Sequence, residues 1–357
     1  MKTLKVGLEQ NSYEIVIEPG LLGKLGALIQ PFIENSGSVA VVTDENVWRC
    51  HGGAFDAAMR AGGIGYRPVV VPPGEAGKSL QGLSGVYDAF ADMALQRGGL
   101  VVAFGGGVVG DLCGFACATW MRGVRFVQVP TSLLAHVDSS VGGKTGINLP
   151  YGKNIVGAFY QPKFVVIDPE TLTTLPEREV RCGMAEIIKY AAIRSKDLFE
   201  LLQERPDNRV LSQIIYDCCA IKADIVARDE RDLGERMLLN FGHTFGHAIE
   251  KKYNFERYNH GEAVAVGMVI AARVGEELGY TAPGTAQKMR SLLILHGLEA
   301  EYKDGRISDL TGLIAADKKS VGDGVHMVFL RDIGESFIQY IDFAALKSVV
   351  ERMGRQQ

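Results

Sequence analysis

LVVAFGGGVVGD, residues 100–111, joins an apolar run to three glycines with the spacing G-x-G-x-x-G. The apolar run predicts a buried strand, and the glycines predict a tight turn that opens a helix. Such a turn can bind a dinucleotide, because the backbone at Gly106 and Gly107 carries no Cβ and can approach a pyrophosphate at the helix N-terminus. The motif alone is weak evidence, and a purely structural turn is the alternative.

Strand and helix patterns alternate around this motif. β-branched runs predict strands at 38–44, 66–75, 99–107, 125–131 and 163–169. Amphipathic stretches predict helices at 46–63 and 79–98. This alternation indicates a mostly parallel sheet covered on both faces, with ligands beyond the carboxyl ends of its strands. We therefore predict an α/β, Rossmann-like nucleotide-binding domain over residues 1–175.

The pattern changes after Pro176. Apolar residues recur at helical spacing in the stretches 177–193, 208–230, 236–253 and 261–279. A strand pair (326–334 and 336–343) and a last helix (344–354) close the chain. We predict a mainly α-helical second domain over residues 176–357, joined without a long linker.

Composition excludes several classes of function. The net charge is −4 and the chain has no basic block, which argues against nucleic acid as a partner. The sequence has no signal-peptide pattern and no run of about 18 apolar residues, so we expect no membrane partner. The six cysteines form no C-x-x-C pair, and we interpret them as reduced thiols in a cytoplasmic protein.

Charged residues at predicted strand ends favour the dinucleotide interpretation. Asp44 ends an apolar strand, where a carboxylate can bind a ribose hydroxyl. Glu75 and Lys78 follow the next strand, and Asp111 follows the glycines at a helix start. The usual fingerprint has its acidic residue roughly 20 positions after the glycines. Asp44 precedes them, so this is not the common Rossmann version.

A second phosphate-like motif, SSVGGKTG at 139–146, resembles a Walker A loop. The leading glycine of that motif would fall at Asp138, a carboxylate where phosphates need backbone amides. We therefore reject a P-loop. Lys144 and Lys153 remain as isolated contacts for a phosphate or a carboxylate.

Three histidines lie close together in the second half. His243 and His247 share one helix face, and His260 starts the next helix. The glutamate of H-E-x-x-H is absent, so this is not the metalloprotease motif. A catalytic zinc site uses three protein ligands, and Glu186, in an otherwise apolar stretch, is the best oxygen ligand.

Cationic side chains occur on the same segments, at Lys189, Lys222, Arg236, Lys318 and Lys319. Lys189 and Lys222 lie inside apolar runs and suggest a substrate that carries a phosphate and a carboxylate. The structural alternative is that one of them pairs with Glu186 as a buried ion bridge.

Four stretches resemble the 3-dehydroquinate synthase family of the sugar phosphate cyclase superfamily, at 104–148, 152–162, 183–191 and 238–250. The resemblance covers nearly the whole chain. It implies a phosphorus–oxygen lyase of the shikimate pathway, dependent on NAD and on Zn²⁺ or Co²⁺, that converts 3-deoxy-D-arabino-heptulosonate 7-phosphate to 3-dehydroquinate and phosphate. In that reaction NAD borrows a hydride from the substrate and returns it after phosphate has been eliminated.

The same resemblance implies roles for single residues. The zinc ligands would be Glu186, His243 and His260. The NAD contacts would be Asp44, Glu75, Lys78, Gly106, Gly107, Asp111, Thr131, Ser132, Lys144, Lys153, Thr174 and Glu179. The substrate contacts would be Asp138, Lys144, Asn154, Lys189, Lys222, Arg236, Asn240, His247 and one of Lys318 and Lys319, of which we choose Lys319. Ser132 stands where a second threonine is usual. Arg122 would reach into the site of the other subunit of a homodimer.

Two alternatives share this architecture. A metal-dependent polyol dehydrogenase would release NADH and would need no phosphate pocket. Such enzymes tend to have Asp where this chain has Glu186, and they lack the three cations Lys189, Lys222 and Arg236. Another sugar phosphate cyclase, with a different ring product, is the second alternative.

Overall fold

A computed structural model describes residues 1–34, 37–315, 320–321 and 323–353. The chain forms two compact units. The first comprises Met1–Val180 and Leu211–Arg231, and the second comprises Arg181–Val210 and the residues from Asp232 onward.

The first unit contains β1 (Lys2–Val6), β2 (Tyr13–Ile17), α1 (Leu25–Ile29), β3 (Val39–Asp44), α2 (Glu45–Ala61), β4 (Arg67–Val71), α3 (Leu80–Asp92), β5 (Leu100–Gly105), α4 (Gly107–Thr119), β6 (Arg125–Pro130), β7 (Lys144–Leu149), β8 (Gly152–Phe159), β9 (Phe164–Ile167), the start of α5 (Glu177–Arg194) and α7 (Leu211–Arg228). The second contains the rest of α5, α6 (Lys196–Gln203), α8 (His243–Lys252), α9 (His260–Glu277), α10 (Thr285–Leu295), α11 (Ser308–Ala315), β10 (Ser320–Val321), β11 (Gly324–Asp332), β12 (Glu335–Asp342) and α12 (Phe343–Met353). Short helical turns lie between these elements, at η1 (Glu9–Asn11), η2 (Leu22–Lys24), η3 (Gln30–Phe32), η4 (Glu75–Gly77), η5 (Trp120–Arg122), η6 (Ala135–Ser139), η7 (Pro169–Thr174), η8 (Asn208–Val210) and η9 (Glu235–Asn240).

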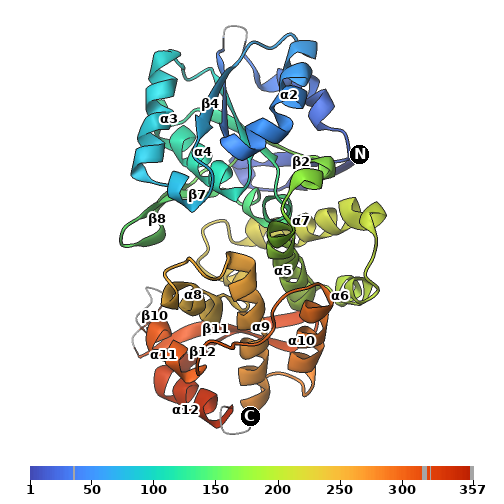
Figure 1. The fold of residues 1–357 in the computed structure, drawn as a ribbon, viewed down its shortest axis with the longest axis vertical. Helices are drawn as coiled ribbons and strands as arrows, with labels where there is room; N and C mark the ends of the chain where they lie inside the picture. Colours follow the sequence, from blue (N-terminus) through green and yellow to red (C-terminus); the bar gives the residue numbers. More distant parts are fainter. Residues whose placement is uncertain (35–36, 316–319, 322, 354–357) are drawn as a thin grey trace. The chain divides into compact units, whose positions relative to one another are not determined.

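A seven-stranded sheet forms the core of the first unit, in the order β1-β2-β9-β6-β5-β3-β4. Only the β1–β2 pair is antiparallel, and the other neighbours are parallel, which confirms the predicted fold class. Alternate residues of the strands face opposite sides. Ala40 and Val42 of β3 pack with α3 and α4, whereas Val39 and Val41 pack with α1 and α2 (Figure 1).

The strand order reverses at β3 and β5. From β3 the chain runs to β4 on one side, and it then returns to form β5 on the other. Ligands of doubly wound sheets bind beyond the carboxyl ends of the strands at such a reversal. Asp44 at the end of β3 and Gly106 after β5 both lie at this point of the sheet. The glycine motif therefore occupies the position that a dinucleotide site requires.

Several features of the first unit were not predicted from the sequence pattern, among them strands β1 and β2. β7 and β8 form an antiparallel hairpin where we predicted no strands. Helix α7 follows the expected boundary at residues 175–176, yet it packs against β1, β2 and η6 of the first unit. Its apolar face, which includes Ile215 and Cys219, is buried there. That residues 1–175 bind the nucleotide and residues 176–357 bind the metal and the substrate stays a prediction.

Helix α9 is the central helix of the second unit. Nearly all of its residues from Gly261 to Gly275 are buried, and α8, α10, α12 and β11 pack against it. β11 and β12 form the predicted strand pair, and α12 is the predicted last helix. The second unit is therefore mainly helical, as expected.

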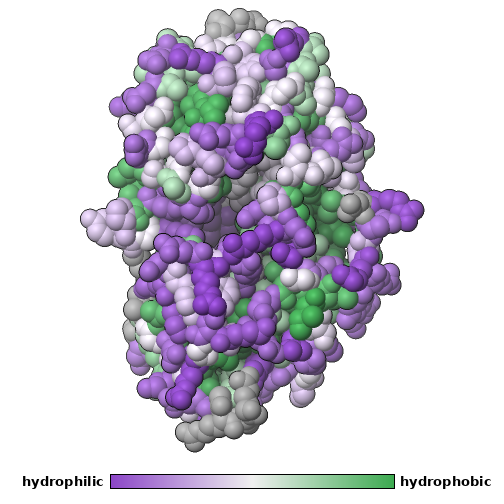
Figure 2. All heavy atoms as spheres, viewed as in Figure 1, coloured by the Kyte–Doolittle hydropathy of each residue, from purple (hydrophilic) through white to green (hydrophobic). Residues whose placement is uncertain are grey.

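The surface and the cysteines agree with the composition. The face seen in Figure 2 is largely hydrophilic, with apolar residues in separate patches. None of the helices in the described part of the chain is long and apolar enough to span a membrane. All six cysteines are free thiols, and only Cys50 is exposed.

Candidate active site

The second unit brings a carboxylate and two imidazoles together. Glu186 lies on α5, His243 is the first residue of α8, and His260 is the first residue of α9. Oε1 of Glu186 is 3.6 Å from Nε2 of His243 and 3.2 Å from Nε2 of His260. The ligand atoms of the three residues lie within 4.8 Å of one another, and Glu186 is fully buried. Three donors of these types are one of the sets that catalytic zinc sites use.

The tautomer of His243 suits a metal ligand. Its Nδ1 lies 3.2 Å from the carbonyl oxygen of Phe241, which can only accept a hydrogen bond. Nδ1 therefore donates its proton to this carbonyl, and the Nε2 lone pair is available to a metal ion between Nε2 and Oε1 of Glu186.

Gly242, with φ of +80°, turns the chain into α8, and a Cβ there would lie 2.5 Å from Cγ of Met268.

A capping box holds the helix turn that carries His260. The side chain of Asn259 accepts a hydrogen bond from the amide of Glu262 at 2.9 Å, and the Glu262 carboxylate accepts one from the amide of Asn259 at 2.9 Å. The start of α9, and with it His260, is thereby fixed.

The two oxygens of Glu186 face different partners. Oε2 pairs with Nζ of Lys189 at 2.5 Å, and Oε1 faces the histidines. The buried Glu186–Lys189 bridge that we considered as an alternative is thus present, and it leaves Oε1 for a cation. Burial alone would lower the pKa of His260, but its contacts with Glu186 and Glu250 raise it to about 10, so a metal ion that binds here would displace the proton from Nε2. Glu186, His243 and His260 fit Zn²⁺ or Co²⁺.

Other predicted substrate contacts lie on the same elements. Lys189 is on α5, Arg236 and Asn240 are on η9 immediately before α8, and His247 is one turn after His243. Arg236 is only 2% exposed. The rings of His243 and His247 are 5.5 Å apart. The second unit therefore combines a candidate metal group with buried cations.

In the first unit, Lys222 of α7 contacts a short π-helix, η6. Its Nζ donates a hydrogen bond to the carbonyl oxygen of Asp138 at 2.7 Å and pairs with Oδ1 of the same residue at 3.0 Å. The thiol of Cys219 donates to the carbonyl oxygen of His136, also on η6. Two predicted substrate contacts, Asp138 and Lys222, are therefore in direct contact.

A buried lysine joins residues that we predicted separately as NAD and substrate contacts. Nζ of Lys78 lies 2.5 Å from Oδ2 of Asp111 and 2.5 Å from Oδ1 of Asn154. Asn148, which no sequence motif indicated, donates to Glu75 at 2.6 Å and accepts from the amide of Asn154 at 3.0 Å. Burial raises the pKa of Asp111, and Lys78 partly opposes that rise.

The glycine turn fits a pyrophosphate. Helix α4 begins after Gly106, which offers no side chain to cap the first amides, so these amides can bind an anion. A Cβ on Gly107 would lie 2.8 Å from Oγ of Ser139, and one on Gly106 would lie 3.3 Å from Oγ of Ser132. The amide of Thr131 donates to the carbonyl oxygen of Gly105 at 3.0 Å. The segment that follows β6 therefore begins beside the glycine turn.

Asp44 has a structural role that the sequence did not reveal. Its Oδ1 accepts hydrogen bonds from the amides of Asn46 at 2.9 Å and Val47 at 3.0 Å, which caps α2. Both bonds use one oxygen, so Oδ2 can still accept from a ribose hydroxyl.

The remaining predicted contacts are scattered. Lys144 begins β7 and is exposed, and Lys153 lies in β8. Thr174 is exposed and contacts Nε2 of His51 at 2.7 Å, and Glu179 is exposed in the first turn of α5. Lys319 lies outside the described residues.

Sequence reasoning missed Glu250, which lies in the last turn of α8 and is only 3% exposed. With His247 and His260 it forms a second group that could hold a metal ion. A signal was available, because Glu250 follows His243 by seven positions and His247 by three, which places all three on one helix face.

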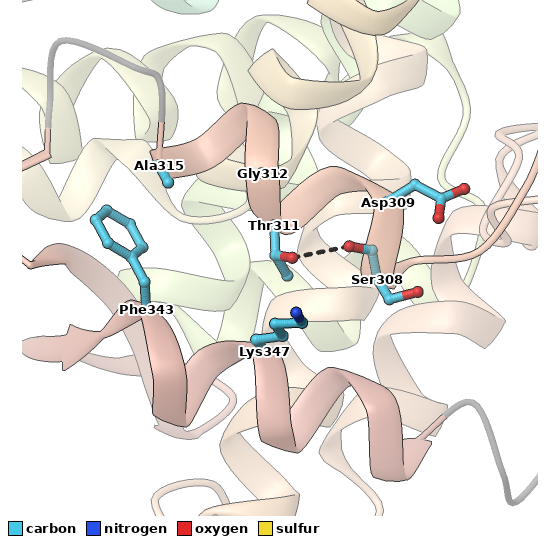
Figure 3. Close-up of a pocket in the computed structure, with 7 residues that line it drawn as sticks. All are labelled: Ser308, Asp309, Thr311, Gly312, Ala315, Phe343 and Lys347. Atoms are coloured by element: carbon cyan, nitrogen blue, oxygen red, sulfur yellow. Dashed lines mark hydrogen bonds between the residues drawn. The ribbon is translucent and has the colours of Figure 1, made fainter.

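A surface pocket of about 380 Å³ lies elsewhere in the second unit, between α11 and α12. Figure 3 shows that Asp309 and Lys347 of its lining point in different directions, and the hydroxyl of Thr311 is already bonded to the carbonyl oxygen of Ser308 at 2.8 Å. Its polar groups do not converge, and none of the predicted site residues lines it.

Family models match the chain in two adjoining parts. Residues 68–182 match "3-dehydroquinate synthase N-terminal", and residues 183–320 match "3-dehydroquinate synthase C-terminal". The chain belongs to the 3-dehydroquinate synthase family. A curated 3-dehydroquinate synthase of Clostridium perfringens (strain SM101) is 46% identical, over 95% of this chain and 97% of that protein. One from Neisseria gonorrhoeae is 42% identical over 96% of each chain.

Solved structures show the same fold at lower identity. A 2-deoxy-scyllo-inosose synthase complexed with carbaglucose-6-phosphate, NAD⁺ and Co²⁺ has a TM-score of 0.86 at 24% identity, covering 98% of this chain and 100% of that one. The 2-epi-5-epi-valiolone synthase of Streptomyces hygroscopicus, with NAD⁺ and Zn²⁺, has a TM-score of 0.87 at 24% identity, covering 98% and 99%. A probable glycerol dehydrogenase of Sinorhizobium meliloti scores 0.63 at 14% identity, covering 95% and 96%. The fold therefore occurs both in cyclases and in dehydrogenases.

Proposed function

We propose that this chain converts 3-deoxy-D-arabino-heptulosonate 7-phosphate to 3-dehydroquinate and phosphate, using NAD and a divalent metal ion. The observation that carries the proposal is the group Glu186, His243 and His260, of which the first two are buried, together with the buried cations Lys189 on α5 and Arg236 on η9. The family supports it, because the curated relatives that match nearly the full length of the chain are 3-dehydroquinate synthases.

Each residue of the metal group has a defined task in this proposal. When bound, the metal would lower the pKa of a substrate hydroxyl, and NAD would supply the hydride-transfer chemistry. Glu186, His243 and His260 would hold the metal ion, and Oε1 and the two Nε2 atoms are the ligand atoms that face one another. Lys189 neutralises and orients the other oxygen of Glu186.

Cations and helix amides bind the anionic parts of the ligands. We assign Arg236 and Lys222 to the substrate oxyanions, because Arg binds a phosphate or carboxylate in a bidentate manner and Lys acts as a point charge. Asp138 keeps Lys222 in place. The amides that open α4 bind the NAD pyrophosphate, and Lys78 orders the loops around Asp111 and Asn154.

A phosphate-release assay tests this function. The chain, the heptulosonate phosphate and NAD at far below the substrate concentration should release phosphate over many turnovers, without accumulation of NADH absorbance. NADH that rises in step with product would show a polyol dehydrogenase instead. Phosphate release only from a different sugar phosphate would show another cyclase.

We further propose a homodimer in the cytoplasm in which Arg122 contacts the substrate of the partner subunit. Arg122 is exposed, and it and Met121 have φ values of 65° and 49°. Two successive non-glycine residues in this region are costly. Such strain supports a defined task for the Arg122 side chain.

A further inference from the structure

We propose that Glu250 is a positioning residue for metal binding. Its carboxylate holds the Nδ1–H of His260, so that Nε2 of His260 faces the metal together with Glu186 and His243. The proposal deepens the proposed function, and it rests on that function only for the assignment of the metal group.

The two nitrogens of His260 face two different carboxylates. Nε2 is 3.2 Å from Oε1 of Glu186, and Nδ1 is 3.9 Å from Oε2 of Glu250. A neutral imidazole has one N–H donor and one lone pair. A metal ion held between Nε2 and Oε1 of Glu186 requires the lone pair of Nε2, so the ring then carries its proton on Nδ1, the nitrogen that faces Glu250.

His243 provides an internal comparison. Its Nδ1–H donates to the carbonyl oxygen of Phe241 at 3.2 Å, which likewise leaves Nε2 for the metal. Both candidate histidine ligands thus have an oxygen facing Nδ1: a backbone carbonyl at 3.2 Å for His243, and a carboxylate at 3.9 Å for His260. An acceptor at this position fixes the ring and makes the ligating nitrogen more basic.

Glu250 occupies a costly place for a purely structural carboxylate. It is 3% exposed, and removing a charge from water costs free energy unless partners compensate it. It also lies in the last turn of α8, where the helix dipole disfavours a negative charge. A carboxylate there is explained when it orients the ring of His260.

A second interpretation makes Glu250 a ligand itself. His247, Glu250 and His260 form an alternative set of possible ligands, which would hold a second metal ion through Nδ1 of His260. The two interpretations differ in metal stoichiometry and in the role of His247. Our proposal requires one metal ion per chain and no contribution from His247 to its affinity.

Metal titration of the full chain separates these interpretations. We would titrate Zn²⁺ and Co²⁺ against a competing chelator for the wild type, Glu250→Gln, Glu250→Ala and the control His247→Gln. We expect one metal ion per wild-type chain, and affinity about 10- to 100-fold weaker in both Glu250 variants, as is typical when the carboxylate that orients a histidine ligand is lost. His247→Gln should bind with the wild-type affinity.

A second measurement does not depend on the variants folding. ¹⁵N chemical shifts of His260 in the Zn²⁺-loaded wild type should show a protonated Nδ1 and a metal-bound Nε2. The reverse assignment would overturn the proposal, as would wild-type affinity in a folded Glu250→Ala chain, two metal ions per wild-type chain, or no metal binding at all. A wild type that binds one metal ion but releases no phosphate would refute the proposed function and leave the role of Glu250 standing.

Discussion

The amide of Gly261, at the start of α9, donates a hydrogen bond to Sγ of Cys182 on α5 at 3.2 Å. The two backbones are in contact at this point, because a Cβ on Gly261 would lie 2.5 Å from both the Cα and the carbonyl oxygen of Cys182. Glu186 lies one helical turn after Cys182, and His260 immediately precedes Gly261. This close packing therefore determines how near the Glu186 carboxylate comes to the His260 ring.

Gly261→Ala should separate the candidate ligands. The added methyl group meets backbone, which cannot move aside like a flexible side chain, so α9 must shift. We expect metal affinity to fall about tenfold or more and the free energy of unfolding to fall by about 2 kcal/mol. Metal titration and chemical denaturation measure the two effects.

Gly312→Ala on α11 is the matched control, because nothing lies within 4 Å of the position that its Cβ would take. It should leave metal affinity unchanged and change stability by less than about 1 kcal/mol. Wild-type metal affinity in Gly261→Ala would show that this contact does not control the ligand geometry.

The metal group can be tested ligand by ligand. Glu186→Ala, His243→Ala and His260→Ala should each bind Zn²⁺ at least about 100-fold more weakly, because a catalytic zinc site has only three protein ligands. His247→Ala should keep the metal and lose turnover. Elemental analysis after dialysis measures retention, and metal loss in His247→Ala with retention in His260→Ala would reverse our choice of ligands.

Removing the buried lysine of the first unit should destabilise it. Lys78→Met leaves Asp111 without the Nζ that lies 2.5 Å from its Oδ2, and the side chain of Lys78 is only 5% exposed. We expect a loss of about 2 kcal/mol, because the half-buried Asp111 carboxylate loses the partner of its charge. Urea denaturation of Lys78→Met and of Lys78→Met/Asp111→Asn should show recovery in the double variant.

The sign of the pH dependence follows from Asp111. Burial raises its pKa, so the stability associated with this carboxyl is fully present at low pH and is lost as pH rises through the folded-state pKa. Without Lys78 the pKa of Asp111 rises further, so acid protonates this carboxyl more readily in the variant. The loss in free energy of unfolding caused by Lys78→Met should therefore be smaller at pH 5 than at pH 7. Lys24→Met is the control, because Lys24 forms an exposed pair with Glu18. It should lower the free energy of unfolding by less than about 0.5 kcal/mol. A deficit that does not depend on pH would contradict this account.

His136 should make the fold sensitive to acid. It is fully buried, its Nε2–H donates to the carbonyl oxygen of Pro130 at 2.9 Å, and burial lowers its pKa from 6.5 to about 4. Its neutral form contributes stability above pH 6.5, and that contribution is lost as pH falls toward 4. We expect the wild type to lose about 2 kcal/mol more between pH 7 and pH 4.5 than His136→Gln, which keeps an amide donor but does not titrate.

Free energies of unfolding from denaturant titrations at the two pH values test this expectation. The exposed His326→Gln should follow the wild type. Equal acid sensitivity of the wild type and His136→Gln would show that His136 does not titrate with folding.

Subunit mixing tests the proposed role of Arg122. Arg122→Ala and Lys189→Ala should each be nearly inactive. In a heterodimer of the two, one site has its own Lys189 and an intact Arg122 from the partner, so activity should rise well above that of either variant. Native mass spectrometry would confirm heterodimers, and no recovery in their presence would place Arg122 outside the partner's site.

The sequence by itself determined five of the seven strands of the main sheet and most helix positions. β-branched runs and helical spacing report local backbone geometry, which depends on residues close together in the chain. The predicted strand 66–75 ends at Val71 because Pro72 and Pro73 follow, and the predicted helix 79–98 ends at Asp92, before Ala94 with φ of 49°. The sequence also pointed to Glu186, His243 and His260, through their residue types and the family resemblance.

Only the tertiary structure decided which side chains meet. Lys78 contacts Asn154 across 76 positions of the chain, and Glu250 approaches His260 across the turn between α8 and α9. Helix α7 packs on the first unit although its sequence lies beyond the expected boundary. A periodic pattern shows which face of an element is apolar, but not which other element covers that face. Contacts between distant residues follow from packing of whole elements, which local sequence does not encode.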